Sequence, residues 1–375
     1  MRAVLRTADQ RRLLFAGMLG FFALGALQSL YGPAFPSLLR RYEVGLDAVG
    51  WTVAAHFAGS FVTIAAAGPL LARLGYRLPL ATGAVGMAAG ALVVATAPGW
   101  SWVLAGAALG GLGFGLVDVA LNLLVARSFA PNAAPALNLL NAFFGVGSVV
   151  GPLAVAAAFG DLRAPMVGLV AVMAALFVLV VRLPEPRRPG EASGRIPWLA
   201  AAGFLLFYFL YVASEVGVGS WVTVHLAPSL GERAAAVNAS LYWGAMTVGR
   251  LLAAPLSARV RPATLVLGAS ALALAALGAA HLPALAPYAY PLVGLAFAPI
   301  FPTGLAWLQR VFPHRAELVA SAVLAAATLG PVATSGGIGW IVERSGPASV
   351  PSQLAVLTGA MTLVVLALWR STRRA

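Results

Sequence analysis

The chain is a succession of apolar stretches with very few charged side chains, each about as long as a membrane is thick. Only 9% of its 375 residues are charged and 61% are hydrophobic, whereas roughly a quarter of the residues in a soluble domain are charged. A membrane-spanning helix needs about 20 apolar residues. The pattern therefore predicts an all-α membrane protein with twelve spanning helices, at residues 13–34, 49–71, 78–97, 102–126, 136–158, 164–181, 198–226, 235–257, 263–281, 284–307, 318–341 and 351–369.

The basic side chains are unevenly distributed over the connections between these stretches. All 24 are arginines, and the net charge is +13. Five lie in one set of alternate connections, where acidic residues balance them: Arg40, Arg41, Arg163, Arg233 and Arg344, with Glu43, Asp47, Asp161, Glu232 and Glu343. Eighteen lie in the tails and the other connections: Arg2, Arg6, Arg11, Arg12, Arg73, Arg77, Arg127, Arg182, Arg187, Arg188, Arg195, Arg259, Arg261, Arg310, Arg315, Arg370, Arg373 and Arg374.

This distribution predicts the orientation of the chain. Arginine is enriched in cytoplasmic loops, so both termini are expected in the cytoplasm, which requires an even number of spans. The positive charge then faces anionic lipid, and no nucleic-acid partner is needed to explain it. The absence of lysine and cysteine fits a high-GC or heat-adapted bacterium, so we expect a multi-pass protein of the bacterial cytoplasmic (inner) membrane.

The chain is expected to consist of two six-helix pseudo-repeats. Residues 183–197 read LPEPRRPGEASGRIP, a composition typical of a polar cytoplasmic linker. It separates residues 1–182 from residues 198–375, and short matches relate the two parts, such as Gly151-Pro152 with Gly330-Pro331. Two such bundles are typical of a transporter whose solute binds near the midplane, where the repeats meet.

Several longer motifs resemble a known family. Six motifs follow one another along the chain: GPLLARLG after the second stretch, GFGLVDVALN in the fourth, LNLLNAFFGVGSVVGP in the fifth, YVASEVGVGSW in the seventh, YWGAMTVGR in the eighth and PIFPT in the tenth. Their order resembles that found in the major facilitator superfamily. They are most similar to its fucose–galactose–proton symporters and sodium-dependent glucose transporters. This resemblance implies alternating-access transport of a sugar-like solute with a cation, by a monomer. The chain departs from the family at Ala72, where the motif normally has an acidic residue, and at Gln28, since sugar symporters of this branch can carry a carboxylate in the first span.

Asp118 is the first candidate for coupling transport to a proton. It shares one face of its helix with Gly111, Gly115 and Asn122, a narrow stripe expected to point into the bundle. A carboxylate at membrane depth is costly and usually faces a partner or an aqueous cavity. Asp118 is interpreted either as a proton carrier or as a structural acceptor of hydrogen bonds between helices.

Glu215 is the second carboxylate within the stretches, and Arg250 is the one arginine within them. Glu215 follows Tyr211 by four residues, and it can bind solute hydroxyls or a cation, or lie near the outer boundary and reach water. Arg250 and Asp118 lie at similar depth, because each precedes the cytoplasmic end of its helix by nine residues. Arg250 is therefore interpreted as the ionic partner of Asp118 or as a side chain that extends to the cytoplasmic interface.

Polar and aromatic side chains supply candidates for solute binding. Amides offer both donors and acceptors to sugar hydroxyls, and aromatic faces stack on apolar surfaces. The same amides equally suit hydrogen bonds between helices, and tryptophan also prefers membrane interfaces. The candidates are Gln28, Asn122, Asn138, Asn141, Tyr211, Trp243, Thr247, Thr303 and Trp307.

The sequence therefore predicts a secondary active transporter of a small polar solute, most simply a sugar, coupled to a proton or, alternatively, to sodium. It shows no nucleophile–base set, phosphate-binding loop or metal-ligand spacing, so we expect no enzyme, catalytic residue, metal or cofactor. One alternative is a proton-driven exporter of drugs or metabolites. Another, from a different class, is a membrane sensor or lipid-handling protein that transports nothing.

Overall fold

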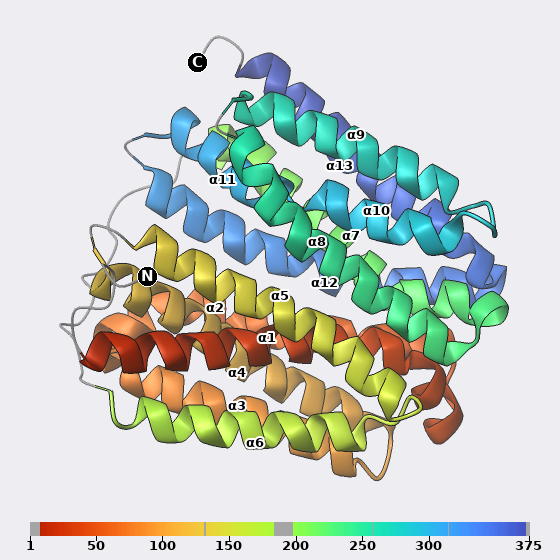
Figure 1. The fold of residues 1–375 in the computed structure, drawn as a ribbon, viewed down its shortest axis with the longest axis horizontal. Helices are drawn as coiled ribbons and strands as arrows, with labels where there is room; N and C mark the ends of the chain where they lie inside the picture. Colours follow the sequence, from red (N-terminus) through yellow and green to blue (C-terminus); the bar gives the residue numbers. More distant parts are fainter. Residues whose placement is uncertain (1–7, 131–132, 184–197, 258, 314, 373–375) are drawn as a thin grey trace. The chain divides into compact units, whose positions relative to one another are not determined.

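The computed structural model describes residues 8–130, 133–183, 198–257, 259–313 and 315–372. Within these ranges the chain forms thirteen α-helices, one 3-10 helix and no strand (Figure 1). The first six are α1 Ala8–Tyr42, α2 Leu46–Leu74, α3 Arg77–Thr96, α4 Trp100–Ser128, α5 Ala134–Ala157 and α6 Arg163–Val180. The others are α7 Trp198–Leu230, α8 Glu232–Ser257, α9 Pro262–Ala279, α10 Ala286–Phe297, α11 Ile300–Val311, α12 Ala316–Ser345 and α13 Val350–Ser371, with the 3-10 helix at Pro347–Ser349.

Most of these helices are long and apolar enough to cross a membrane. In the described part of the chain eleven segments qualify by length and composition, with α10 and α11 counted together as Ala286–Val311. The eighth predicted span, at residues 235–257, is present as α8 but is not among these eleven segments; α8 contains Glu232, Arg233 and Arg250. The all-α class and the predicted order of helices are confirmed.

The tenth predicted span, at residues 284–307, is not one continuous helix. It is divided into α10 and α11 at Ala298 and Pro299. A proline inside a helix lacks the N–H that would bond to the preceding turn, and its ring crowds that turn. Pro299 and Pro302 both lie here, so the break has a local cause.

Contacts divide the chain into two compact units. Unit 1 comprises Met1–Ala34 and Ala55–Ala192, and unit 2 comprises Phe35–Ala54 and Ser193–Ala375. The segment Phe35–Ala54, which joins α1 to α2, thus groups with the C-terminal helices, whereas the sequence places it in the N-terminal bundle. The boundaries at residues 182 and 198 stay a prediction, and the predicted linker lies outside the described residues except for Leu183.

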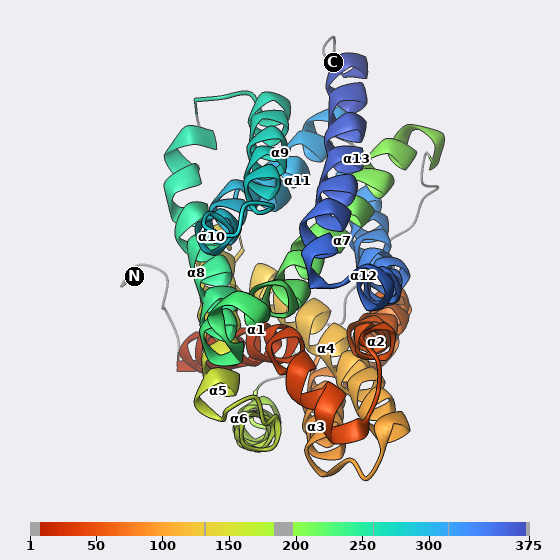
Figure 2. The same cartoon turned by 90° about the vertical axis from the view of Figure 1, so that its right-hand side faces the viewer.

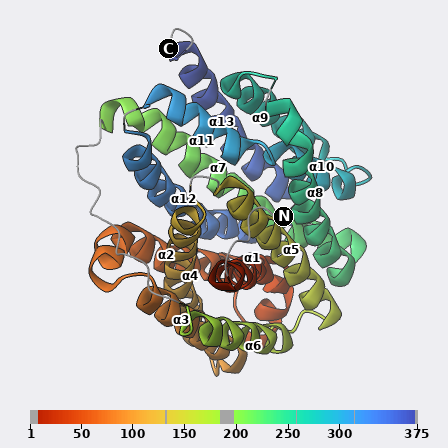
Figure 3. The ribbon, with the colours of Figure 1, turned by 60° about the vertical axis from the view of Figure 1, so that its left-hand side comes forward.

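In unit 1, α1 packs against α4, α5 and α6, and Figure 3 shows it nearly end-on among them. Its tightest contact is with α5. A side chain at Gly147 would strike the main-chain oxygen of Phe22, and one at Gly25 would strike that of Phe144. Glycine at these positions lets the two backbones approach closely, as is common between membrane helices.

In unit 2, α7 occupies the corresponding position, since it packs against α8, α12 and α13. Figure 2 shows α9 beside α10, α11 and α13. A side chain at Gly330 of α12 would strike the main-chain oxygen of Phe209 of α7, just as Gly147 does with Phe22. Gly330 and Gly147 thus allow the same kind of close backbone approach, each to the first helix of its own half.

Candidate functional site

Glu215 lies in the interior of unit 2, where only 8% of its surface is exposed. The hydroxyl of Tyr211, one turn earlier on α7, donates a hydrogen bond of 2.9 Å to Glu215 Oε1. The same hydroxyl lies 3.4 Å from the main-chain oxygen of Phe297, at the end of α10. The predicted interpretation of Glu215 as a carboxylate that reaches water near the outer boundary does not fit this burial.

Arg250 supplies the positive charge beside this carboxylate. Its Nη2 lies 3.6 Å from Glu215 Oε1, and its side chain is 26% exposed while that of Glu215 is 10% exposed. Neither the predicted partnership with Asp118 nor an extension to the cytoplasmic interface describes this contact. Among the described residues Arg250 Nε is buried and has no hydrogen-bond partner, so the guanidinium retains donor capacity.

Trp243 and Thr247 lie on α8 before Arg250, and Trp243 packs against α7. Trp243 is 3% exposed, and its ring lies where a side chain at Gly219 of α7 would be. Its indole N–H is buried without a partner in the described part of the chain. Thr247 already donates its hydroxyl to the main-chain oxygen of Trp243, at 2.8 Å, so Thr247 can offer only acceptor lone pairs to another group.

Tyr242 belongs to the same cluster and was missed by the sequence analysis. Its fully buried hydroxyl donates to the main-chain oxygen of Glu215, at 2.9 Å. Tyr242 precedes Trp243, which the sequence did single out, but nothing in the spacing shows that α8 contacts α7 at this height. Tyr211, Glu215, Tyr242, Trp243 and Arg250 are called the Glu215 cluster below.

Asp118 has a different environment in unit 1. Its surface is half-buried, and Asn122 donates to its Oδ1 at 2.9 Å and lies 3.1 Å from its main-chain oxygen. Among the described residues, Asn122 is the one hydrogen-bond partner of the carboxylate, and it lies on the same helix, α4. Asp118 therefore joins no second helix, which does not support its interpretation as an interhelical acceptor.

Three of the other predicted solute-binding residues belong to unit 1. Gln28 is half-buried on α1, and Asn138 and Asn141 are exposed on α5. Asn141 donates to the main-chain oxygen of Leu137 in its own helix, at 2.9 Å. Asn141 therefore uses part of its hydrogen-bonding capacity within its own helix.

Thr303 and Trp307 lie on α11, and both are buried. Trp307 Nε1 donates to the hydroxyl of Thr372 at 3.1 Å, and its ring packs edge-on against Phe204. Thr372 follows the end of α13. The indole of Trp307 thus ties α11 to the C-terminal end of the last helix.

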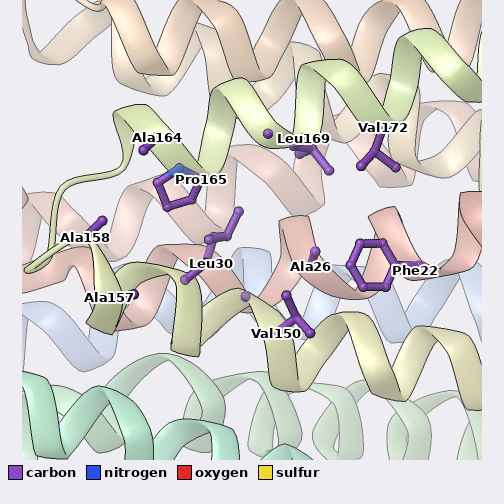
Figure 4. Close-up of a pocket in the computed structure, with 13 residues that line it drawn as sticks. Phe22, Ala26, Leu30, Val150, Ala157, Ala158, Ala164, Pro165, Leu169 and Val172 are labelled. Atoms are coloured by element: carbon purple, nitrogen blue, oxygen red, sulfur yellow. The ribbon is translucent and has the colours of Figure 1, made fainter.

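A pocket of about 560 Å³ opens in unit 1 between α1, α5 and α6 (Figure 4). It is lined by Phe22, Ala26, Leu30, Val150, Gly151, Ala154, Ala157, Ala158, Ala164, Pro165, Gly168, Leu169 and Val172. None of these side chains can form a hydrogen bond, so the pocket offers little to a polar solute. In the described ranges no three His, Asp or Glu side chains are grouped closely enough to hold a metal ion.

Comparison with known proteins identifies the family. Residues 17–290 match the sequence profile of the Major Facilitator Superfamily. The sodium-dependent glucose transporter 1 of Xenopus laevis is 23% identical over 90% of this chain and 77% of the relative. The glucose/mannose transporter GlcP of Bacillus subtilis (strain 168) is 22% identical over 86% of each chain.

The fold is shared with solved transporter structures. The nucleoside transporter NupG superposes with a TM-score of 0.79 over 97% of this chain and 100% of NupG, at 13% sequence identity. The matching proteins are transporters, which confirms the prediction that the chain is a membrane transporter and not an enzyme. With its profile match spanning most of its length, the chain belongs to the Major Facilitator Superfamily.

Proposed function

We propose that the chain is a secondary active transporter that moves a sugar by alternating access and couples this movement to protons. The fold does not select the solute, because a nucleoside transporter shares it. The sugar is supported by the two relatives, which are named as glucose transporters and match most of this chain.

The observation that carries the proposal is the contact between Glu215 and Arg250. Burying a charge is unfavourable unless it is paired, so the carboxylate and the guanidinium stabilise each other's charged forms. Uptake of a proton by Glu215 would remove the negative charge and release Arg250 toward another acceptor. The free donors of Arg250 and Trp243 suit the hydroxyl oxygens of a sugar, so proton binding and solute binding would favour each other.

The same contact favours a proton over sodium as the coupling ion at Glu215. A sodium ion prefers several oxygen ligands, whereas here a guanidinium lies 3.6 Å from Glu215 Oε1. A sodium ion bound to Glu215 would lie close to this guanidinium, and two positive charges repel each other strongly in a medium of low dielectric constant. Asp118, which has no cationic partner among the described residues, is the second proposed proton carrier.

The other parts of the proposal rest on the sequence. Eighteen arginines in the tails and alternate connections support cytoplasmic termini in a bacterial inner membrane. A monomer with no cofactor remains the simplest form. Beyond the Glu215 cluster, the proposed solute contacts are Gln28, Asn122, Asn138, Asn141, Thr247, Thr303 and Trp307.

The test is uptake of labelled sugars into proteoliposomes under an imposed inward proton gradient. The panel comprises hexoses and pentoses, with a nucleoside as the comparison solute. We expect one sugar to accumulate above its outside concentration. We expect the Glu215→Gln variant to lose that accumulation. Equal accumulation without the gradient contradicts proton coupling. No sugar uptake, but proton movement when a lipophilic cation is added, assigns the chain to the exporters.

A further inference from the structure

His56 of α2 is buried in unit 1 in an unusual way. It is 1% exposed, and neither ring nitrogen has a hydrogen-bond partner among the described residues. A neutral imidazole always has one donor and one acceptor. Leaving a buried polar group without a partner costs about 1–3 kcal/mol, so this environment penalises histidine at both nitrogens.

Aromatic rings surround His56. Phe57 and Phe114 contact it edge-on, with ring centroids 5.3 and 5.0 Å away. Tyr31 of α1 lies 5.7 Å away and is the titratable group that faces it from that helix. From α4 the ring meets Phe114, and no Asp, Glu or Arg of the described residues contacts it. A phenylalanine would therefore fit these neighbours without the two unpartnered nitrogens, and packing alone does not explain a histidine here.

Hydroxyl groups continue from His56 along the same face of α2. Ser60 follows one turn later, is fully buried, and its hydroxyl lies 3.0 Å from the main-chain oxygen of His56 and 3.1 Å from that of Gly111. Thr63 is next, with its hydroxyl 3.2 Å from the main-chain oxygen of Ser60. These three side chains form a polar stripe that leads away from the aromatic rings.

The stripe lies against glycines of α4, the helix that also carries Asp118. A side chain at Gly111 would strike the main chain of His56, and one at Gly115 would strike the hydroxyl of Thr63. The contacts between α2 and α4 therefore continue in the same direction along both helices. Asp118 lies in the turn of α4 that follows Gly115. Two turns, about 10.5 Å of helix rise, separate the levels of Gly111 and Asp118.

We propose that His56 is a proton-binding residue of the transport cycle, which takes up a proton from the outer side and delivers it toward Asp118. This inference rests on the proposed proton-coupled transport and on the orientation with cytoplasmic termini. The imidazole binds one proton from water on its lone-pair nitrogen and returns to the neutral form when the Asp118 carboxylate takes that proton. The described conformation holds the neutral, dehydrated ring, and water supplies its missing partners when this region of unit 1 opens outward.

The first test compares the parent with His56→Phe, which keeps the aromatic packing and removes both nitrogens. The variant is expected to unfold at the temperature of the parent or a higher one, because it removes two buried nitrogens that lack partners, and solute exchange is expected to persist. The dependence of exchange on external pH between about 5 and 8, where histidine titrates, is expected to become weaker, and gradient-driven accumulation is expected to fall. His281→Phe is the matched control, because His281 is exposed at the end of α9 and bonds Ser352. A His56→Phe variant whose exchange has the same pH profile as that of the parent would overturn the inference.

A second measurement keeps the inference testable if His56→Phe does not fold. The chain has no cysteine, so His56→Cys provides a single thiol without further changes. We expect a membrane-impermeant thiol reagent added outside to label this cysteine. We expect the cysteine to be protected from the reagent when the transporter is held open to the inner side. No labelling from outside in any state shows that water does not reach this position and overturns the inference.

The two proposals fail in different ways. A parent protein that never accumulates sugar under a proton gradient contradicts the proposed function, and the role of His56 falls with it. A parent that accumulates sugar, together with a His56→Phe variant of identical pH dependence, contradicts only the role of His56.

Discussion

Asp118 and Glu215 both lie well inside a membrane-spanning helix, yet the two units hold them differently. Glu215 is 8% exposed and contacts two tyrosines and an arginine from α7 and α8. Asp118 is half-buried, and its partner Asn122 comes from its own helix. A change of charge at Glu215 therefore alters contacts between helices, whereas the same change at Asp118 breaks none that the structure describes.

This difference suggests a division of work within one transporter. A carboxylate held by neighbouring helices can link its charge to the arrangement of those helices. A carboxylate with a single partner on its own helix can gain and lose a proton with little structural cost. We therefore expect substitutions in unit 2 to change both stability and transport, and substitutions at Asp118 to change coupling alone.

The largest effect is expected for Arg250→Met, which leaves Glu215 buried without its cation. Removing one partner of a buried ion pair costs roughly 3–5 kcal/mol, and the 26% exposure of Arg250 reduces this to about 2 kcal/mol. Thermal unfolding in detergent is expected at a lower temperature than for the parent, with sugar uptake lost. The double variant Glu215→Gln/Arg250→Met should recover part of the stability but no accumulation. An Arg250→Met protein as stable as the parent would show that the contact is unimportant.

Asp118→Asn should separate coupling from stability. The neutral amide still accepts the hydrogen bond from Asn122, so the unfolding free energy should stay within about 0.5 kcal/mol of the parent. Accumulation against a sugar gradient should be lost, because no proton can be carried at this position, while exchange of sugar across the membrane persists. Parallel assays of uptake and exchange in proteoliposomes decide this, and undiminished accumulation would exclude Asp118 from coupling.

Much of the fold could be predicted, because a bilayer imposes length and composition on every spanning helix. The break between α10 and α11 could not. Prolines also lie inside the continuous helices α2, α5 and α12, as Pro69, Pro152 and Pro331. A proline alone therefore does not show whether a helix is interrupted, and the pattern of apolar residues does not supply that information.

The candidate site was predictable only in part. A spacing of four residues predicts that Tyr211 and Glu215 share a face of α7, and their hydrogen bond shows that they do. The sequence suggested Asp118 as the ionic partner of Arg250, whereas the structure pairs Arg250 with Glu215. Equal depth within two helices cannot reveal which helices pack together. Tyr242 was missed for the same reason, since its contact with Glu215 depends on how α8 packs against α7.

A smaller effect is expected for Tyr211→Phe, which removes the hydrogen bond to the carboxylate. One such bond contributes about 1 kcal/mol, equivalent to roughly fivefold in an equilibrium constant. We expect a shift of this size in the apparent sugar affinity, measured by uptake at graded concentrations. Tyr242→Phe is the matched control, because its hydroxyl bonds the main-chain oxygen of Glu215 and not the carboxylate. Equal shifts in both variants would mean that the tyrosines act only through packing.

The smallest effect is expected for Asn122→Ala in unit 1. A side-chain pair four residues apart on one helix contributes about 0.2–0.5 kcal/mol, so thermal unfolding should hardly change. Loss of the hydrogen bond removes one group that stabilises the ionised carboxylate of Asp118, and accumulation should reach its half-maximum at a higher external pH. A pH profile of gradient-driven uptake measures this shift, with Thr82→Ala as the comparison, because the hydroxyl of Thr82 bonds main-chain oxygens of its own helix. If Asn122→Ala instead destabilises the protein as strongly as Arg250→Met, Asp118 has interhelical contacts after all, and the contrast between the two carboxylates does not hold.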